Sequence, residues 1–539
     1  MNAALDIVLA YHEQTKHHFQ RYSAGPGGLD WATQPEPFRR FAGSPHLALP
    51  LLTHEFTGIR YRDLYARTPI APCALSVTSI ANLLELAFGL SAWKQYGNNR
   101  WALRCNPSSG NLHPTEAYVI TQYCEGIVDG VHHYVSRDHI LEQRCTFNTQ
   151  DRLLPTGSLL LGLSAVHWRE AWKYGERAYR YCQHDAGHAI AAARYAAAVL
   201  GWRAEVLSSR SDEAIASLLG LNRAADFDAA EHEVPDVLLL ITTQPTRDIV
   251  DATALVNATT QWIGQANALS THHAHNWPVI EEVSVACNKP TTTDEAWPVP
   301  EQPEPIPTEC QQSAVAIIKQ RRSAQEFDGV TTISAMTFYR MLDVTLPRAN
   351  IPPWDAIAWT PRIHLALFVH RVDGLQPGLY LFMRHSDIET KMRASLSTEF
   401  QWERVENCPA HLALYRVVAG DTRQAAKALS CHQDIAADGA FSLAMLAEYE
   451  SNLTHTPWLY RQLFWEAGML GHVLYLEAEA AGVRGTGIGC FFDDGVHDVL
   501  GIQGTWLQSL YHFTVGGALN DTRLQTLPPY AHLQRSAHD

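Results

Sequence analysis

The stretch Gly-Val-Arg-Gly-Thr-Gly-Ile-Gly-Cys-Phe-Phe-Asp-Asp-Gly-Val-His-Asp-Val-Leu-Gly-Ile, residues 482–502, has four closely spaced glycines at 482, 485, 487 and 489. Glycine lets a backbone turn sharply and approach a ligand without a Cβ in the way. The preceding segment has the apolar pattern of a helix, whereas the glycine motif of dinucleotide-binding folds follows a strand. The stretch therefore predicts a ligand-binding glycine turn after a helix, and it argues against a dinucleotide-binding fold.

The glycine-rich stretch has an earlier counterpart at a constant offset of 281 residues. At this offset Tyr460-Arg461 corresponds to Tyr179-Arg180, and the segment 493–501 corresponds to 212–220. One offset without gaps over about 40 residues indicates an internal duplication. The first copy has no glycine at the positions that correspond to 485, 487 and 489. The sequence therefore predicts two related domains, of which only the second keeps the glycine turn.

Length and composition agree with two globular domains. With 539 residues the chain is too long for one ordinary core, and 46% hydrophobic with 18% charged residues is typical of a soluble protein. The net charge of −15 argues against nucleic acid or an anionic membrane as a partner. The start of the chain lacks the apolar run of a signal peptide, and no stretch approaches the ~18 apolar residues of a membrane span.

The cysteine and histidine residues indicate neither disulfides nor a metal site. The ten cysteines form no Cys-x-x-Cys motif, which is typical of reduced thiols in the cytoplasm. His272, His273 and His275 lie in a polar stretch with the character of a loop. We therefore expect a cytoplasmic protein without a bound metal.

A proline-rich segment divides the chain. Five prolines lie among acidic residues between Trp297 and Pro307, a composition typical of a semi-rigid extended linker. We expect a first domain at residues 1–290, the linker at 291–309 and a second domain at 310–539.

Hydrophobic periodicity predicts one plan for both domains, in which a helix, two strands, a long buried helix and the turn follow each other. The segment 75–84 matches 333–342, and 130–134 matches 378–382. Strands are expected at 116–122 and from residue 130, and helices at 3–20, 76–89 with Ser76 as its cap, 171–201 and after Ser334 through Leu342.

Three short motifs carry polar groups suited to a ligand. Pro107-Ser108-Ser109-Gly110-Asn111 has the composition of a shaped loop, and its hydroxyl and amide groups are short hydrogen-bonding side chains. Arg321-Arg322-Ser323 precedes a predicted helix. Lys173-Tyr174 lies at the start of the long helical region of the first domain, where the second domain has Thr454-His455.

Together with Gly-Thr-Gly-Ile-Gly at 485–489, these motifs resemble the FMN-dependent nitroreductase superfamily. In the first half, the segments 11–17, 29–31, 107–114 and 173–177 are similar to SagB/ThcOx-type dehydrogenases, which include azoline oxidases of thiazole/oxazole peptide biosynthesis. The resemblance extends over about residues 10–245 and 312–530. It implies two tandem α+β domains, each an antiparallel sheet flanked by helices, that together form an intramolecular pseudo-dimer with FMN at their interface.

The resemblance also implies that each flavin site is composite, and this chain divides the parts between its halves. The first half has the Ser-Ser loop, but near residues 60–62 it lacks a clean Arg-Arg-Ser motif, and its glycine turn is eroded. The second half has Arg-Arg-Ser and the glycine turn, but Ile351-Pro352-Pro353-Trp354 replaces the Ser-Ser loop. We therefore expect one complete FMN site, a degenerate second site, and a monomer or weak homo-oligomer.

Arginine pairs can bind a phosphate or the flavin oxygens where reduced flavin gathers negative charge, and glycines let backbone amides approach the ring. Gln325 stands where the family often has a second basic residue. The residues that the resemblance assigns to the cofactor are Pro107, Ser108, Ser109, Asn111, Arg321, Arg322, Ser323, Gln325, Gly485, Gly487, Ile488, Gly489 and Arg523.

The resemblance assigns catalysis to Lys173 and Tyr174, because azoline oxidases use this dipeptide for proton transfer. The function that it implies is oxidation of an azoline-like ring or a related C–H bond in a peptide or small molecule, with biosynthetic partner proteins possible. Two alternatives stay open: an NAD(P)H-dependent reductase of nitro compounds, quinones or alkenes, and a non-catalytic scaffold.

Simpler interpretations of the same residues also stay open. Arg321 and Arg322 could be a solvated pair beside a helix, and Lys173-Tyr174 could cover the side of a helix. Asp493 and Asp494 have the position of helix N-terminal acids, which the helix dipole stabilises.

Overall fold

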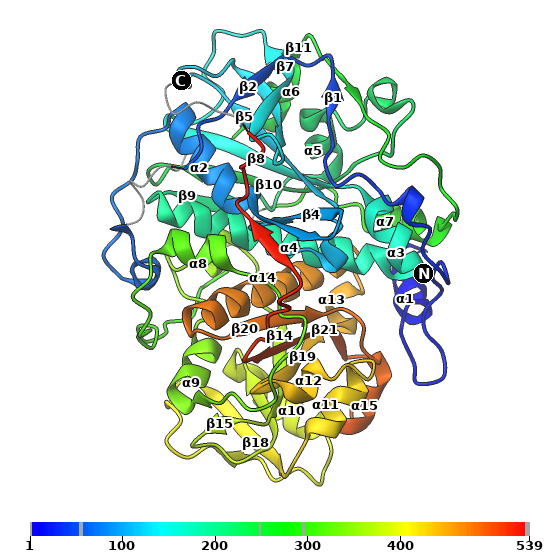
Figure 1. The fold of residues 1–539 in the computed structure, drawn as a ribbon, viewed down its shortest axis with the longest axis vertical. Helices are drawn as coiled ribbons and strands as arrows, with labels where there is room; N and C mark the ends of the chain where they lie inside the picture. Colours follow the sequence, from blue (N-terminus) through cyan, green and yellow to red (C-terminus); the bar gives the residue numbers. More distant parts are fainter. Residues whose placement is uncertain (1–2, 53–57, 247–249, 294–296, 534–539) are drawn as a thin grey trace.

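The computed structural model describes residues 3–52, 58–246, 250–293 and 297–533. The chain is an α+β protein with two antiparallel sheets, one in each half, and helices on the faces of each sheet (Figure 1). The two halves meet along the long helices α4 (Ala178–Val199) and α14 (Leu459–Ala480), which lie side by side across the middle of the molecule (Figure 1).

The sheet of the first half runs in the order β11-β7-β6-β5-β8-β10-β9, and β2 also pairs with β7. Its strands are β2 (His46–Ala48), β5 (Thr115–Thr121), β6 (Gly130–Val135), β7 (Ile140–Phe147), β8 (Ser158–Ala165), β9 (Arg203–Val206), β10 (Val234–Thr242) and β11 (Thr259–Thr260). The other helices of this half are α1 (Ala3–Gln14), α2 (Val77–Ala87), α3 (His167–Tyr174), α5 (Asp212–Leu219), α6 (Ala252–Ala258) and α7 (Pro278–Ala286).

The sheet of the second half runs in the order β17-β18-β16-β14-β19-β21-β20. Its strands are β14 (Ile363–Val369), β16 (Gly378–Met383), β17 (Glu403–Arg404), β18 (Ala413–Ala419), β19 (Phe441–Glu448), β20 (Arg484–Ile488) and β21 (Leu507–Gly516). The helices around it are α8 (Ala314–Gln320), α9 (Ala335–Asp343), α10 (Glu389–Ser395), α11 (Arg423–Leu429), α12 (Ile435–Asp438), α13 (Glu450–Leu453) and α15 (Asp493–Leu500).

Three smaller pairings complete the strands. β1 (Phe41–Ala42) pairs with β12 (Gln265–Ala266), and β13 (Ile333–Ser334) pairs with β15 (Val372–Asp373). The third is a small sheet of β3 (Leu90–Tyr96), β4 (Asn99–Arg104) and β22 (Gln525–Leu527). Because β22 lies near the C-terminus, the end of the second half is hydrogen-bonded to the first half, as the red strand of Figure 1 shows.

The duplication predicted from the constant offset is confirmed. Six strands occur in the same order in the two sheets, with β7-β6-β5-β8-β10-β9 matching β18-β16-β14-β19-β21-β20. The long helices, the following strands and the short helices after them each begin 281 residues apart. Both short helices end at a glycine in the left-handed conformation, Gly220 (φ 73°) and Gly501 (φ 70°), which a Cβ would disfavour. The fold class implied by the resemblance is therefore correct.

Each sheet has a helix layer on both faces, and β8 shows why. Its residues alternate between two cores: Leu159, Leu161 and Leu163 belong to the core that includes α4, and Leu160 belongs to the core that includes α5. Successive side chains of a strand point to opposite faces, so an unbroken apolar run fits a sheet covered on both sides.

Several predicted elements are confirmed and others end differently. Ser76 caps α2 as expected, and the helix expected after Ser334 is α9, which Ser334 caps. The predicted helix at 3–20 ends at Gln14, and the predicted helix at 171–201 is broken at Gly175 (φ 57°). A Cβ at Gly175 would collide with the backbone around Ala24, so the packing of the N-terminal segment explains this break. The segment 297–312 contains no helix or strand.

The two long helices cross at equivalent glycines. A Cβ added to Gly187 of α4 would collide with the carbonyl oxygen of Trp465, and one added to Gly468 of α14 would collide with the carbonyl oxygen of His184. The helix backbones therefore touch at this crossing, as they do wherever small residues let two helices approach closely.

Two reciprocal ion pairs flank the crossing. Arg180 of α4 donates to Asp493 at the start of α15 (2.7 Å), and Arg461 of α14 donates to Asp212 at the start of α5 (2.8 Å). All four side chains are buried. Because the two pairs occupy equivalent positions, the halves contact each other like the subunits of a symmetric dimer. The interpretation of Asp493 as a helix N-terminal acid is confirmed.

None of the described helices combines the length and the apolar character that a bilayer crossing requires.

The helix crossing generates a stability prediction. Gly187→Ala is expected to lower the free energy of unfolding by about 1–3 kcal/mol or more, because the added methyl meets rigid backbone rather than a movable side chain. Chemical denaturation of the full chain measures the change. Gly28→Ala is the control, since nothing lies within 4 Å of a Cβ at Gly28, and it should change stability by less than about 0.5 kcal/mol. Equal effects of the two variants would contradict the close crossing.

Candidate active site

The candidate site is a cavity of about 860 Å³ between the two halves. Its size is within the range of small-molecule and cofactor sites, about 300–1,000 Å³. One wall comes from the first half, with the loop at 107–111 and the ends of β3 and β4. The opposite wall comes from the second half, with residues 320–325, the end of β20 and the segment that leads to β22.

The loop at 107–111 is held in shape by its own polar groups. Ser109 donates its N–H (3.0 Å) and its hydroxyl (3.1 Å) to the buried carboxyl of Asp185 in α4. Asn111 donates from Nδ2 to the carbonyl of Ala102 (2.9 Å), and its Oδ1 lies 2.9 Å from Nε2 of His113. Pro107, Ser108, Ser109 and Asn111 all line the cavity, as the sequence predicts.

The Arg-Arg-Ser segment joins the two halves rather than facing solvent. Arg321 is buried and donates to the backbone carbonyls of Arg104 and Cys105, both at 3.1 Å. Arg322 donates to the carbonyl of Ser91 (2.9 Å). The hydroxyl of Ser323 lies 2.8 Å from that of Tyr475. The interpretation of the arginines as a solvated pair is therefore wrong.

Five cations line the cavity without an acidic partner: Lys94, Arg104, Arg321, Arg322 and Arg484. Within the described ranges, no carboxylate lies within 4.0 Å of any of them. Burial, followed by repulsion from Arg321, lowers the pKa of Arg322 to about 10. Burial, followed by repulsion from Arg322 and Arg484, also lowers the pKa of Lys94. A bound anion would relieve this repulsion, so the arrangement suits a phosphate.

The glycine-rich segment is a strand and not the predicted turn. Gly485 and Gly487 lie in β20, and the φ angles of Gly485, Gly487 and Gly489 are not positive. A Cβ at Gly485 would meet the ring of Phe513, one at Gly487 the hydroxyl of Tyr511, and one at Gly489 the ring of Tyr181. These glycines are required because aromatic side chains cover the strand closely. Gly487, Ile488 and Gly489 line the cavity, whereas Gly485 does not.

Lys173 and Tyr174 lie at the end of α3, against the loop of the cavity wall. A Cβ built on Gly110 (φ 58°) would lie 2.6 Å from the Tyr174 hydroxyl and 3.1 Å from Nζ of Lys173. Gly110 therefore lets both groups approach the loop, and Tyr174 itself lines the cavity. Burial, followed by the charge of Glu170, raises the pKa of Tyr174 well above its ordinary value.

Two buried acids, Glu170 and Asp185, lie behind this dipeptide, and neither was identified as a site residue from the sequence. Both carboxylate oxygens of Glu170 are buried without a hydrogen-bond partner among the described residues, and burial raises the pKa of Glu170 well above its ordinary value. Burial likewise raises the pKa of Asp185 to about 7, although the hydrogen bonds from Ser108 and Ser109 oppose this shift. Both acids are spaced along helices as core residues are, so only the three-dimensional contacts identify them.

Two predicted cofactor residues differ in position from the rest. Gln325 lines the cavity and is exposed. Arg523 does not line it: its side chain is 72% exposed and pairs with Asp521 (2.7 Å). Lys94 and Arg484 supply the additional positive charge instead. Arg484 lies within the glycine-rich stretch and could have been identified there, but Lys94 is brought to the cavity by the pairing of β3 with β22.

The equivalent place, which corresponds to this cavity through the internal duplication, differs from it in its lining residues and in the pairing of its charges. It is lined by the proline-rich residues 299–305, and three of the four arginines that line it are paired with acids. These pairs are Arg67 with Glu304, Arg194 with Asp355, and Arg348 with Asp343. Arg194 stands where the first cavity has Tyr475. This place therefore offers no excess positive charge comparable to that of the first cavity.

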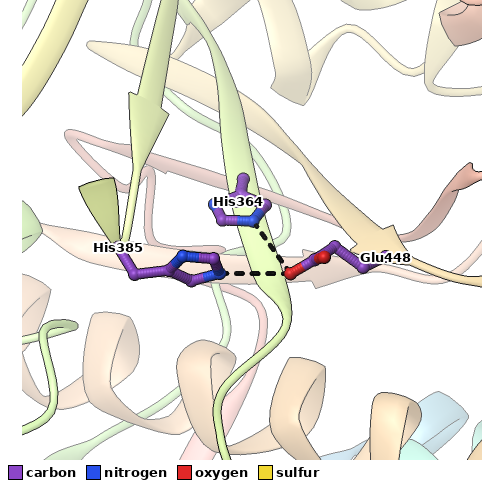
Figure 2. Close-up of side chains that lie close together, drawn as sticks. All are labelled: His364, His385 and Glu448. Carbon is purple, nitrogen blue, oxygen red and sulfur yellow. Dashed lines mark hydrogen bonds and ion pairs between the residues drawn. The ribbon is translucent and has the colours of Figure 1, made fainter. Parts of the chain in front are cut away.

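A cluster of His364, His385 and Glu448 lies on the sheet of the second half (Figure 2). Nε2 of His364 (3.6 Å) and Nε2 of His385 (3.1 Å) face the same carboxylate oxygen. The N–H of Arg384 donates to Nδ1 of His364 (3.3 Å), so the neutral ring carries its proton on Nε2, toward Glu448. That proton occupies the position a metal would need. In the polar stretch at 272–275, His273 stacks on Trp168 and pairs with Glu231.

The raised pKa of Asp185 generates a pH prediction. Because the folded-state pKa of about 7 exceeds the ordinary value of 3.8, the folded protein binds this proton more tightly than the unfolded chain. The resulting stabilisation is complete below about pH 4 and is lost as the pH rises to 7. Asp185→Asn should remove this loss, reducing the pH slope of the unfolding free energy by up to about 1.4 kcal/mol per pH unit. Urea denaturation from pH 4 to 7 measures the slope.

The exposed acid Asp228 provides the control, and Asp228→Asn should keep the wild-type slope over the same pH range. An Asp185→Asn variant with the wild-type slope would show that Asp185 ionises normally in the folded protein.

Comparison with known proteins supports the architecture. The family model described as the nitroreductase family matches residues 76–228. No curated protein matches the chain. A solved structure from Anabaena variabilis, described as a nitroreductase, is similar over 95% of this chain and 99% of its own, with 22% identity and a TM-score of 0.64.

Two further structures match parts of the chain. A protein from Ralstonia eutropha, also described as a nitroreductase, covers 43% of this chain and 93% of its own, with 16% identity and a TM-score of 0.26. A chain of the E. coli microcin synthetase McbBCD complex with truncated pro-MccB17 bound matches 46% of this chain and 94% of its own length, with 20% identity and a TM-score of 0.28. Residues 76–228 thus match the nitroreductase family model, and the chain as a whole has the fold of two tandem nitroreductase-type domains.

Proposed function

We propose that the cavity binds one FMN per chain and that the protein is an FMN-dependent dehydrogenase of the SagB/ThcOx type. The substrate class that we propose is an azoline-like ring, or a related C–H bond, in a peptide or small molecule. The observation that carries the proposal is the position of Lys173 and Tyr174, which reach the loop of a cavity that also gathers five unpaired cations.

The residues of the cavity fit FMN at both ends of the molecule. Lys94, Arg322 and Arg484 supply positive charge for the phosphate. The hydroxyl and amide groups of the 107–111 loop suit the ribityl chain and the ring edge. Four lining residues have a buried polar atom without a partner among the described residues: Nε of Arg104, Oδ1 of Asn106, Nδ1 of His113 and Nδ1 of His188.

When bound, FMN would supply a two-electron acceptor, and the chain's own residues would handle the proton. The raised pKa of Tyr174 keeps its hydroxyl protonated at neutral pH, so this group donates a hydrogen bond and orients the substrate. Lys173, whose Nζ also reaches the loop, would move the proton. The dipeptide thus divides orientation and proton transfer between two residues.

The proposed functional unit is a single chain, since its two halves supply both walls of the site. The location that we propose is the cytoplasm. A peptide substrate could be delivered by partner proteins of a biosynthetic pathway. We propose no contact with nucleic acid or with a membrane, in keeping with the net charge of −15.

The number of flavins bound per chain tests whether there is a single site. Flavin released by denaturing the purified protein should amount to about one FMN per chain, because three of the four arginines at the equivalent place are paired with acids. Arg322→Ala should weaken FMN binding by about 10- to 100-fold, the value of a hydrogen bond to a charged group. The matched control, Arg67→Ala, removes a cation at the equivalent place and should leave binding unchanged. A ratio near two flavins per chain would contradict the single site.

A variant of Lys173 separates proton transfer from flavin binding. Lys173→Ala should keep its flavin but oxidise an azoline-containing peptide about 10²–10⁴-fold more slowly, the usual effect of losing a positioned acid or base. The control is Thr454→Ala at the equivalent position, where Thr454 donates to the carbonyl of Glu450 and lies in the other half. It should leave turnover unchanged.

Three other outcomes would reject the proposal in distinct ways. Full activity of Lys173→Ala with bound flavin would make the dipeptide a packing element. Rapid bleaching of the flavin by NADPH alone would indicate a reductase. Purified protein without flavin absorbance, and unable to take up added FMN, would indicate a scaffold.

A further inference from the structure

Two cysteines far apart in the sequence meet beside the cavity. Cys431 follows α11, and Cys490 follows β20. Their Sγ atoms lie 2.7 Å apart, closer than an ordinary sulfur contact, although both thiols are free. A disulfide requires about 2.05 Å, so a small movement would bring the two sulfurs to bonding distance.

Backbone contacts hold the two segments together independently of the thiols. The N–H of Phe492 donates to the carbonyl of Leu429 (2.8 Å). The side-chain amide of Gln433 donates to the carbonyls of Ser430 (2.9 Å) and Cys490 (3.1 Å). The segments of the two cysteines are therefore held together by hydrogen bonds that do not involve the thiols.

The surroundings favour a thiolate at Cys490. The pKa of Cys490 is lowered by a hydrogen bond from Cys431, and then by His17 and Arg177. The N–H of Ser23 donates to Nδ1 of His17 (2.9 Å), so the neutral ring carries its proton on Nε2 and can donate it to the sulfur. Arg177 donates to the carbonyl of Gly489, which places its positive charge beside the next residue. Thiolates are the reactive form of cysteine.

The pair is accessible as well as activated. Both cysteines are half-buried, and Cys490 and Gln433 line the same cavity as the 107–111 loop. Of the partly exposed cysteines, Cys408 has no such setting, because burial raises its pKa to about 11.

We propose that Cys431 and Cys490 form a redox-active dithiol that reduces a low-molecular-weight disulfide at the wall of the cavity. The Cys490 thiolate attacks one sulfur of the disulfide, forms a mixed disulfide and releases the first small thiolate, which takes up a proton. Cys431 then loses its proton, attacks Sγ of Cys490 and releases the second thiolate, which also takes up a proton. Two protein thiols are oxidised to one disulfide, and one small disulfide is reduced to two thiols.

Oxidised glutathione serves as the probe. The reduced full-length protein is incubated with it, remaining thiols are alkylated, and the peptides are mapped by mass spectrometry under non-reducing conditions. The expected product is a peptide pair linked through Cys431 and Cys490, with release of two molecules of glutathione per chain. This measurement uses the wild-type protein and depends on neither flavin nor the proposed dehydrogenase activity.

Variants assign the two roles. Cys431→Ser should accumulate glutathione on Cys490, because the resolving thiol is missing. Cys490→Ser should react with oxidised glutathione at least about tenfold more slowly than the wild type, since the activated thiolate is gone. The control Cys408→Ser should behave like the wild type. Absence of the 431–490 link in the wild type, or unchanged reactivity of Cys490→Ser, would overturn the proposal.

Discussion

The contact between the backbones of α4 and α14 at Gly187 and Gly468 sets the geometry of the whole molecule. The two helices begin 281 residues apart in a duplicated chain, so the crossing brings equivalent surfaces together about a local two-fold relation. The reciprocal pairs Arg180–Asp493 and Arg461–Asp212 follow from this relation. Since neither glycine accommodates a side chain, the distance between the halves is fixed by backbone contact, and so is the width of the cavity between them.

The two halves have diverged most where they would form two equivalent sites. One place keeps unpaired cations, glycines under aromatic rings and a polar loop. At the other, the proline-rich segment contributes Glu304 to pair with Arg67, and Asp355 pairs with Arg194. A cation paired with a carboxylate has lost most of its capacity to attract a phosphate. The difference in charge pairing is the physical reason why one chain carries one candidate site instead of two.

Much of the architecture could be predicted from the sequence, because it depends on local periodicity and on the offset between copies. The caps Ser76 and Ser334 mark helix starts through short-range hydrogen bonds, which depend only on neighbouring residues. The break at Gly175 and the strand conformation at Gly485–Gly489 could not be predicted, since they depend on Ala24 and on aromatic rings from distant segments. The domain limits at 290 and 310 stay predictions.

The sequence by itself determined the duplication, the shared order of elements in the two halves and the motifs that meet at the cavity, because each is a pattern of residue types along the chain. The tertiary structure alone decided which charges remain unpaired and which buried groups have shifted pKa values. Lys94 enters the cavity through the pairing of β3 with β22, and Asp185 lies under the loop through the position of α4. Cys431 and Cys490 meet for the same reason: a pKa or a sulfur contact depends on distance in space, which residue order does not specify.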